Sequence, residues 1–138
     1  MNPLQNWENA HFKKILEELK QANIDLSIPN IPLIIQETSF AVRSKKYPEQ
    51  CPYYRKTHSC HPEVQDLNCF LCACPYYKSD SLEGGCEINS NSGKWHSPYP
   101  YSSSNKVWDC SDCSIPHSPE FVEKWLRQNL DKLKQRFD

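Results

Sequence analysis

The chain lacks a long hydrophobic run. Its longest apolar stretch, residues 31–35, is interrupted by Pro32 and is far shorter than the roughly 20 apolar residues that a membrane helix needs. The N-terminus also lacks the basic start and apolar segment of a secretory signal peptide, because charged residues such as Glu8 and Lys13 interrupt it. We therefore expect a cytoplasmic protein without a membrane partner.

An excess of charge of either sign is absent as well. The sequence holds 16 Lys and Arg against 17 Asp and Glu, for a formal net charge of -1. A protein that binds nucleic acid without sequence preference presents a basic surface to the phosphates. Paired tyrosines near the basic residues between 43 and 56 offer stacking surfaces for a single strand. The balanced charge instead favours tyrosine rings that cover a small core, so nucleic acid is not the expected partner.

Familiar catalytic motifs are missing too. The sequence has no Gly-rich phosphate loop, no His-Glu-x-x-His and no nucleophile elbow. This favours a binding module over an enzyme. Such a module acts by docking a protein partner, whose identity the sequence does not name.

The middle of the chain has few large aliphatic side chains. Residues 51–117 are rich in Pro, Ser, Tyr and Asn, and the mean hydropathy of the chain is -0.78. Ordering each residue costs about 1.5 kcal/mol, which so polar a segment cannot offset by burying apolar surface. A structural zinc ion contributes about 10–16 kcal/mol at neutral pH. We therefore expect the middle to fold around bound metal.

Eight cysteines in that segment supply the ligands. Cys69 and Cys72 form one Cys-x-x-Cys turn, and Cys110 and Cys113 form another. Two such turns direct four thiolates to one tetrahedral site, and this quartet is the strongest combination. His117 follows closely and competes for a place in it. Because cytoplasmic thiols stay reduced, metal binding is favoured over disulfides.

The remaining cysteines and a neighbouring histidine provide a second site. They are Cys51, Cys60, Cys74, Cys86 and His61. Cys72 and Cys74, with only Ala73 between them, are expected to serve different sites. Either His61 or His117 can instead donate a hydrogen bond to a ligating sulfur. The candidate metal ligands are Cys51, Cys60, His61, Cys69, Cys72, Cys74, Cys86, Cys110, Cys113 and His117.

The remaining histidines, His11, His58 and His96, are expected at the surface. Thiolate-rich sites suit zinc, iron–sulfur clusters and copper(I). We predict two zinc ions. The alternative is an iron–sulfur cluster for electron transfer or redox sensing, since Cys74-Pro75 resembles the Cys-Pro of ferredoxin motifs. A second alternative is a metalloenzyme or metal carrier with an open coordination position.

Amphipathic helices are expected at both ends. Within residues 7–22, apolar side chains recur at helical spacing from Phe12 to Leu19. Ser118-Pro119-Glu120 is a helix start signal, followed by apolar residues at the same spacing. Between these helices, the pattern predicts a connector over residues 23–32, a strand over residues 33–42 and an exposed loop over residues 90–105.

The expected fold is a small metal-stabilised α+β domain, irregular and loop-rich around its cysteines and flanked by the two amphipathic helices. We divide the chain into an N-terminal helix and connector (1–44), a cysteine-rich metal-binding core (45–120) and a C-terminal helix packed on that core (121–138).

Five blocks of the sequence, taken in order, carry a family resemblance. They are Cys51-x-Tyr53-Tyr54, Cys60-His61, residues 68–77, Cys86 and residues 109–117. Together they resemble the cysteine-rich small domain family, a zinc-finger-like module, over about residues 45–120. That family is described as metal-binding and occurs alone or fused to cobamide-synthesis enzymes. The resemblance implies that the cysteines and His117 are ligands, and it points to a role near cobamide metabolism.

Overall fold

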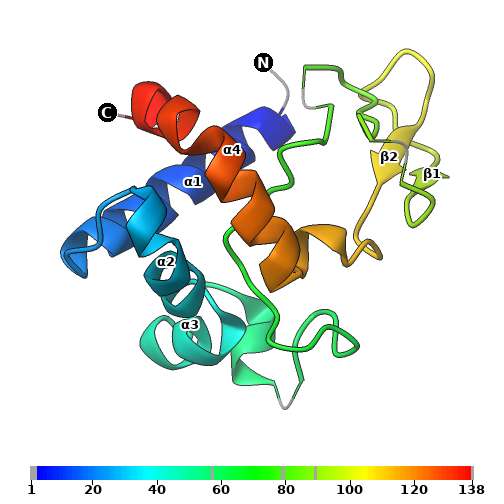
Figure 1. Cartoon of the computed structure of the whole chain (residues 1–138). Coiled ribbons are helices and arrows are strands. Elements are labelled where there is room, and N and C mark those ends of the chain that lie inside the picture. The colour runs from blue at the N-terminus through cyan, green and yellow to red at the C-terminus, as the bar shows by residue number, and fades with distance from the viewer. Residues whose placement is uncertain (1–2, 57, 79, 89, 138) are drawn as a thin grey trace.

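The computed structural model describes residues 3–56, 58–78, 80–88 and 90–137. Its described part contains four α-helices and one two-stranded sheet, joined by 3-10 turns and irregular segments. The elements in order are α1 Pro3–Gln21, η1 Ile28–Asn30, α2 Ile31–Glu37, α3 Phe40–Lys46, η2 Pro52–Arg55, β1 Lys94–His96, β2 Val107–Asp109, η3 Ile115–His117 and α4 Pro119–Phe137. Figure 1 shows the α-helices together on one side and the sheet on the other. This mixed helix and sheet fold confirms the α+β part of the expected class.

The two predicted terminal helices are present. α1 begins earlier than expected, at Pro3. α4 begins where the start signal places it, and the Ser118 hydroxyl accepts a hydrogen bond from the N–H of Phe121 at 3.4 Å. The C-terminal end of α4 contacts the N-terminal half of α1, since Arg136 Nη1 lies 3.4 Å from Glu8 Oε1. None of the helices in the described ranges combines the length and apolarity needed to cross a membrane.

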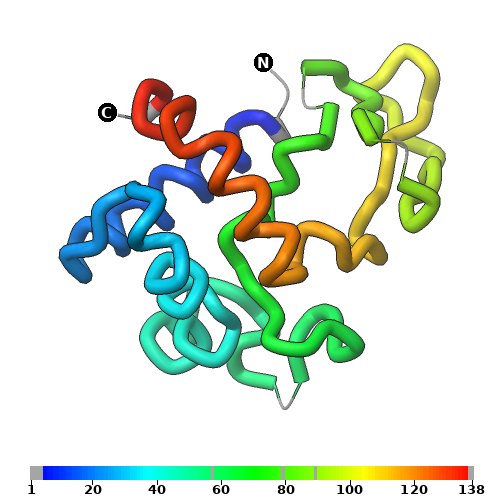
Figure 2. Tube along the Cα trace, viewed as in Figure 1, coloured from blue at the N-terminus to red at the C-terminus, as the bar shows by residue number. Residues whose placement is uncertain are grey.

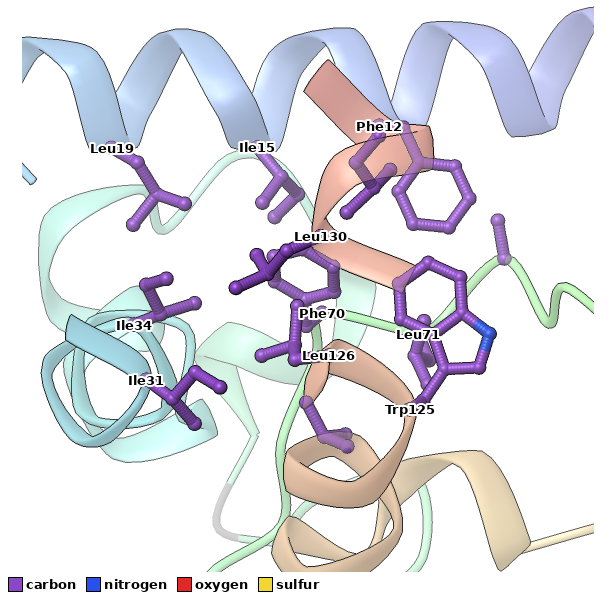
Figure 3. Packing of buried hydrophobic residues seen from close by; sticks show 13 residues of the cluster. Phe12, Ile15, Leu19, Ile31, Ile34, Phe70, Leu71, Trp125, Leu126 and Leu130 are labelled. Carbon is purple, nitrogen blue, oxygen red and sulfur yellow. The ribbon is translucent and has the colours of Figure 1, made fainter. Parts of the chain in front are cut away.

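A single hydrophobic core joins the helices to the start of the cysteine region. Figure 3 shows side chains of α1, α2 and α4 pointing at one another around Phe70 and Leu71. The buried cluster consists of Phe12, Ile15, Leu19, Ile31, Ile34, Phe70, Leu71, Ala73, Val122, Trp125, Leu126, Leu130 and Leu133. Burying a large apolar side chain of this kind contributes about 1.5–3 kcal/mol. The core therefore fixes the chain on both sides of Phe70, where several cysteines lie.

The strand predicted over residues 33–42 is wrong, because this segment forms α2 and α3. Ile31 and Ile34 lie one helical turn apart, and both are fully buried. Pro32 stands in the first turn of α2, where a missing N–H costs nothing. Ser39 then caps α3 with its hydroxyl. The proline that suggested a break in the chain is instead a helix-starting residue.

The cysteine region is largely turns, as expected. Within the loop predicted over residues 90–105, β1 forms and pairs antiparallel with β2, with Trp95 opposite Trp108. All three residues of β1 are exposed. Figure 2 shows the chain around residues 68–75 passing through the middle of the molecule, beside α4. This central segment carries Cys69, Cys72 and Cys74.

Candidate metal centre

One cleft of about 800 Å³ gathers the predicted ligands. Every one of the ten lines it except Cys69, which is buried behind it at 8% exposure. Aromatic side chains, among them Tyr53, Tyr76 and Trp108, complete the walls. The structure therefore brings the candidate ligands to one region of the molecule, at the ends of turns.

Cys51, Cys60, Cys69 and Cys72 form a first cysteine set. The N–H of Cys72 donates to the carbonyl of Cys69 at 3.2 Å, which closes the predicted Cys-x-x-Cys turn. Burial raises the pKa of Cys69 to about 11; a hydrogen bond from Tyr54 opposes the rise, and Cys60 and Cys51 add to it. Cys72 is exposed to the cleft, yet the protein around it raises its pKa to about 12, with further contributions from Cys69, Cys60 and Cys51. These effects place the four thiols in one neighbourhood of the molecule.

Cys74, Cys86, Cys110 and Cys113 form a second cysteine set. Burial raises the pKa of Cys74 to about 12, and the other three thiols contribute to the rise. Burial likewise raises the pKa of Cys110 to about 11, with Cys113 next in importance. Ser90 lies between two members of this set, since its N–H donates to Cys86 Sγ at 3.4 Å and its hydroxyl is 3.5 Å from Cys113 Sγ.

Backbone contacts assemble the second set. Tyr77 and Cys86 form an antiparallel bridge, which places Cys86 close to the Cys74 turn. The Tyr77 hydroxyl donates to the carbonyl of Trp108 at 2.7 Å, and the N–H of Trp108 donates to the carbonyl of Glu83 at the same distance. β2 is thereby tied to the Cys74–Cys86 segment, and Cys110 follows directly after β2.

The predicted quartet of Cys69, Cys72, Cys110 and Cys113 differs from the grouping that the pKa effects indicate. Its two Cys-x-x-Cys turns belong to different sets. The reason is physical: Tyr54 holds Cys69 next to the Cys51 turn, while contacts of Tyr77 hold β2 next to Cys74. That Cys72 and Cys74 serve different sites stays a prediction.

His61 and His117 lie beside the first set. One ligand atom from each of these histidines and Cys60 Sγ are all within 4.8 Å of one another. His117 therefore lies with Cys60 although it is closer in sequence to Cys113. Its N–H donates to the carbonyl of Ser114 within the η3 turn, and its carbonyl accepts from the N–H of Asn68 at 2.8 Å, which fixes the backbone of His117 beside the central segment. Burial lowers the pKa of His117, so its imidazole is neutral at physiological pH and free to act as a metal ligand.

A buried charged network that the sequence did not predict supports the first set. Arg43, at 3% exposure, forms an ion pair with Glu18 and donates to the Tyr54 hydroxyl at 2.9 Å and to Gln50 Oε1 at 2.7 Å. Tyr54 in turn hydrogen-bonds Cys69. The sequence does contain one indication of this network: Glu18 comes three residues after Ile15 and therefore lies on the apolar side of the first helix.

The remaining histidines differ in their surroundings. His58 and His96 are exposed, as expected. The expectation for His11 is wrong: it is half-buried, and its Nε2 lies 3.0 Å from the carbonyl oxygen of Phe70. Burial lowers its pKa to about 4. His11 therefore links α1 to the central segment as a neutral side chain.

The donor set fits a thiolate-binding metal. Eight thiols and two histidines are the ligand types that zinc and other thiolate-binding metals prefer, and ligand atoms of Cys60, His61 and His117 lie within 4.8 Å of one another. Because the metal-free thiols have raised pKa values, a bound dication would release their protons and stabilise the thiolates.

Comparison with known proteins agrees with this chemistry. The family model described as "zf-like: Cysteine-rich small domain" matches residues 43–137 and therefore includes α4. No curated protein and no solved structure matches the chain. The family match spans more than half of the sequence and contains both cysteine sets, so this protein belongs to the cysteine-rich small domain family.

Proposed function

We propose that this protein is a cytoplasmic zinc-binding module in which each cysteine set holds one zinc ion. The observation that supports the proposal is that seven of the eight cysteines line one cleft, and their pKa effects on one another fall into two groups of four thiols. Four cysteine ligands complete the tetrahedral coordination of a zinc ion, which is typical of structural sites.

The zinc ions have a structural role in this proposal. Between residues 74 and 112, none of the described hydrophobic side chains belongs to the buried core. The sheet side of the molecule therefore has little apolar burial of its own to offset its conformational entropy. Metal ligation at the second set supplies that stabilisation.

The role of the folded module is to dock a protein partner. The cysteine region offers turns and exposed aromatic side chains, and no recognisable catalytic motif accompanies them. The resemblance to domains fused to cobamide-synthesis enzymes supports a partner near cobamide metabolism.

Metal analysis tests the proposal. Protein purified anaerobically without added metal should contain zinc and no acid-labile sulfide. Cys69→Ser and Cys110→Ser should each lose about one zinc ion, whereas the control His58→Ala should lose none. Iron with matching sulfide would establish the iron–sulfur alternative instead. If NMR spectra recorded in strong chelator showed that the part of the molecule around β1 and β2 stays fully folded, a structural role for the metal would be contradicted.

A further inference from the structure

We propose that Cys60, His61 and His117 hold an additional metal ion whose fourth coordination position opens on the cleft and binds a small organic thiol. This inference rests on the proposed metal binding of the first cysteine set. It adds a site of a different kind, with mixed sulfur and nitrogen ligands and a place for an external ligand.

The histidines have the arrangement of metal ligands. Their rings lie side by side, with centroids 4.9 Å apart, and each is buried. His117 Nδ1 lies 3.1 Å from the carbonyl oxygen of Asn68, and His61 Nδ1 lies 3.4 Å from Glu63 Oε1. A ligating imidazole typically donates its second N–H to such an oxygen, which fixes the ring and leaves the other nitrogen for the metal. This arrangement would leave Nε2 of each ring for a metal near Cys60, whose Sγ lies within 4.8 Å of one nitrogen of each histidine.

The number of donors leaves one position open. Cys60, His61 and His117 are the metal-ligating residues that the described part of the chain brings within 4.8 Å of one another. A tetrahedral metal takes four ligands, and three protein ligands with an open fourth position are typical of sites that bind an external ligand. Cys60 also belongs to the first cysteine set, so its thiolate would be shared between the two sites.

The cleft determines what can occupy that position. Cys60, His61 and His117 all line it, and its volume of about 800 Å³ is within the range of small-molecule sites. Its lining includes Tyr76 and Phe121, whose rings meet edge to face. None of the described lining residues is Lys or Arg, whereas Glu8 and Asp109 are present. A ligand with a further anionic group is therefore disfavoured, and a thiol with an apolar body fits. It would bind as the thiolate, with its proton released to solvent and its charge offset by the metal dication.

Metal stoichiometry provides the first test, with cobalt(II) as a spectroscopic substitute for zinc. The wild-type protein should bind about three cobalt ions, one of them beyond the two sites formed by the cysteine sets. His61→Ala and His117→Ala should each bind about two, and the matched control His58→Ala about three. Two ions in the wild type would overturn this inference while leaving the proposed function intact. Failure to bind any metal would contradict both.

Ligand binding provides the second test. Benzyl mercaptan, added to the cobalt-loaded protein, should change the visible spectrum and saturate at about one equivalent. Toluene, which has the same ring and no donor atom, should leave the spectrum unchanged. In His61→Ala the response to benzyl mercaptan should be lost, because that variant lacks the additional metal ion. An unchanged wild-type spectrum with benzyl mercaptan, or an equal response in His61→Ala, would show that the open position does not exist.

Discussion

Arg43 Nε donates a 2.9 Å hydrogen bond to the hydroxyl of Tyr54. That hydroxyl also hydrogen-bonds Cys69, and burial raises the pKa of Tyr54, so it stays protonated and acts as the donor to sulfur. Because Arg43 is buried and cationic, it polarises the Tyr54 O–H toward the thiolate. Arg43 also pairs with Glu18 of α1. A chain of contacts therefore leads from α1 to the first cysteine set.

Removing the Tyr54 hydroxyl should weaken metal binding at the first set. We expect Tyr54→Phe to lower the zinc affinity of one site by about 10–100-fold, the range for hydrogen-bond partners of metal ligands. Competition with a chromophoric chelator measures the change. The matched control is Tyr53→Phe, since the Tyr53 ring faces Lys56 Nζ at 4.5 Å and belongs to the same turn. An equal loss in both variants would mean that Tyr54 has no specific effect on Cys69.

The metal-free fold should be sensitive to alkaline pH. Burial raises the pKa values of Cys69 and Cys110 to about 11 and that of Cys74 to about 12, from a usual value of 9.0. A thiol with a raised folded pKa stabilises the fold fully below the unfolded pKa and loses that contribution as the pH rises through the folded pKa. The free energy of unfolding of the metal-free protein should therefore fall between about pH 9 and pH 12.

Urea denaturation at several pH values measures this effect, with the zinc-loaded protein as the control. Its thiols are already deprotonated, so they should add no slope in that window. Burial also raises the pKa of Tyr77 to about 12, but tyrosine ionisation affects both forms and cancels in the comparison. Parallel slopes for the two forms would show that the thiols are not the titrating groups.

The sequence predicted the parts of the fold that repeat a simple pattern. α1 and α4 were predictable because one apolar face recurs over many turns, as Phe12, Ile15 and Leu19 illustrate. α2 and α3 were not, because each has only seven residues, too few for helical periodicity to be distinguished from a strand. Pro32 also permits either a break or a helix start.

For the site, residue types were predictable and their grouping was not. Spacing alone indicates that Cys69 and Cys72 share a turn, since the hydrogen bond that closes it is local. Which turns meet depends on contacts between distant segments, such as Tyr54 with Cys69 and Tyr77 with Trp108. No local spacing encodes those contacts.

The large core residue that follows Cys69 should be important for stability. Phe70 is fully buried and lies between Phe12 of α1 and Trp125 of α4. Phe70→Ala should lower the free energy of unfolding by about 3–5 kcal/mol, because it removes buried surface and leaves a cavity. Chemical denaturation of the metal-loaded protein measures the loss. Leu33→Ala is the control; Leu33 is 50% exposed, so its effect should stay within about 0.5 kcal/mol.

Gly84 should be important for the second cysteine set alone. Its φ of +73° favours glycine, and an alanine Cβ there would lie 2.8 Å from Tyr77 Cε1 and closer still to the Tyr77 hydroxyl. Gly84→Ala should displace Tyr77, break its hydrogen bond to Trp108 and move β2 away from Cys74. The left-handed backbone alone costs about 1–2 kcal/mol for alanine, and about 1.4 kcal/mol is a tenfold change in affinity.

We therefore expect Gly84→Ala to release about one zinc ion to a chelator at least tenfold more readily than the wild type, while the first set keeps its metal. Leu82→Ala, at a 50% exposed position of the same turn, should release zinc as the wild type does. Loss from both sets together would mean that the sets are not independent. In that case the sheet side and the central segment would have to fold as one unit around a shared cluster.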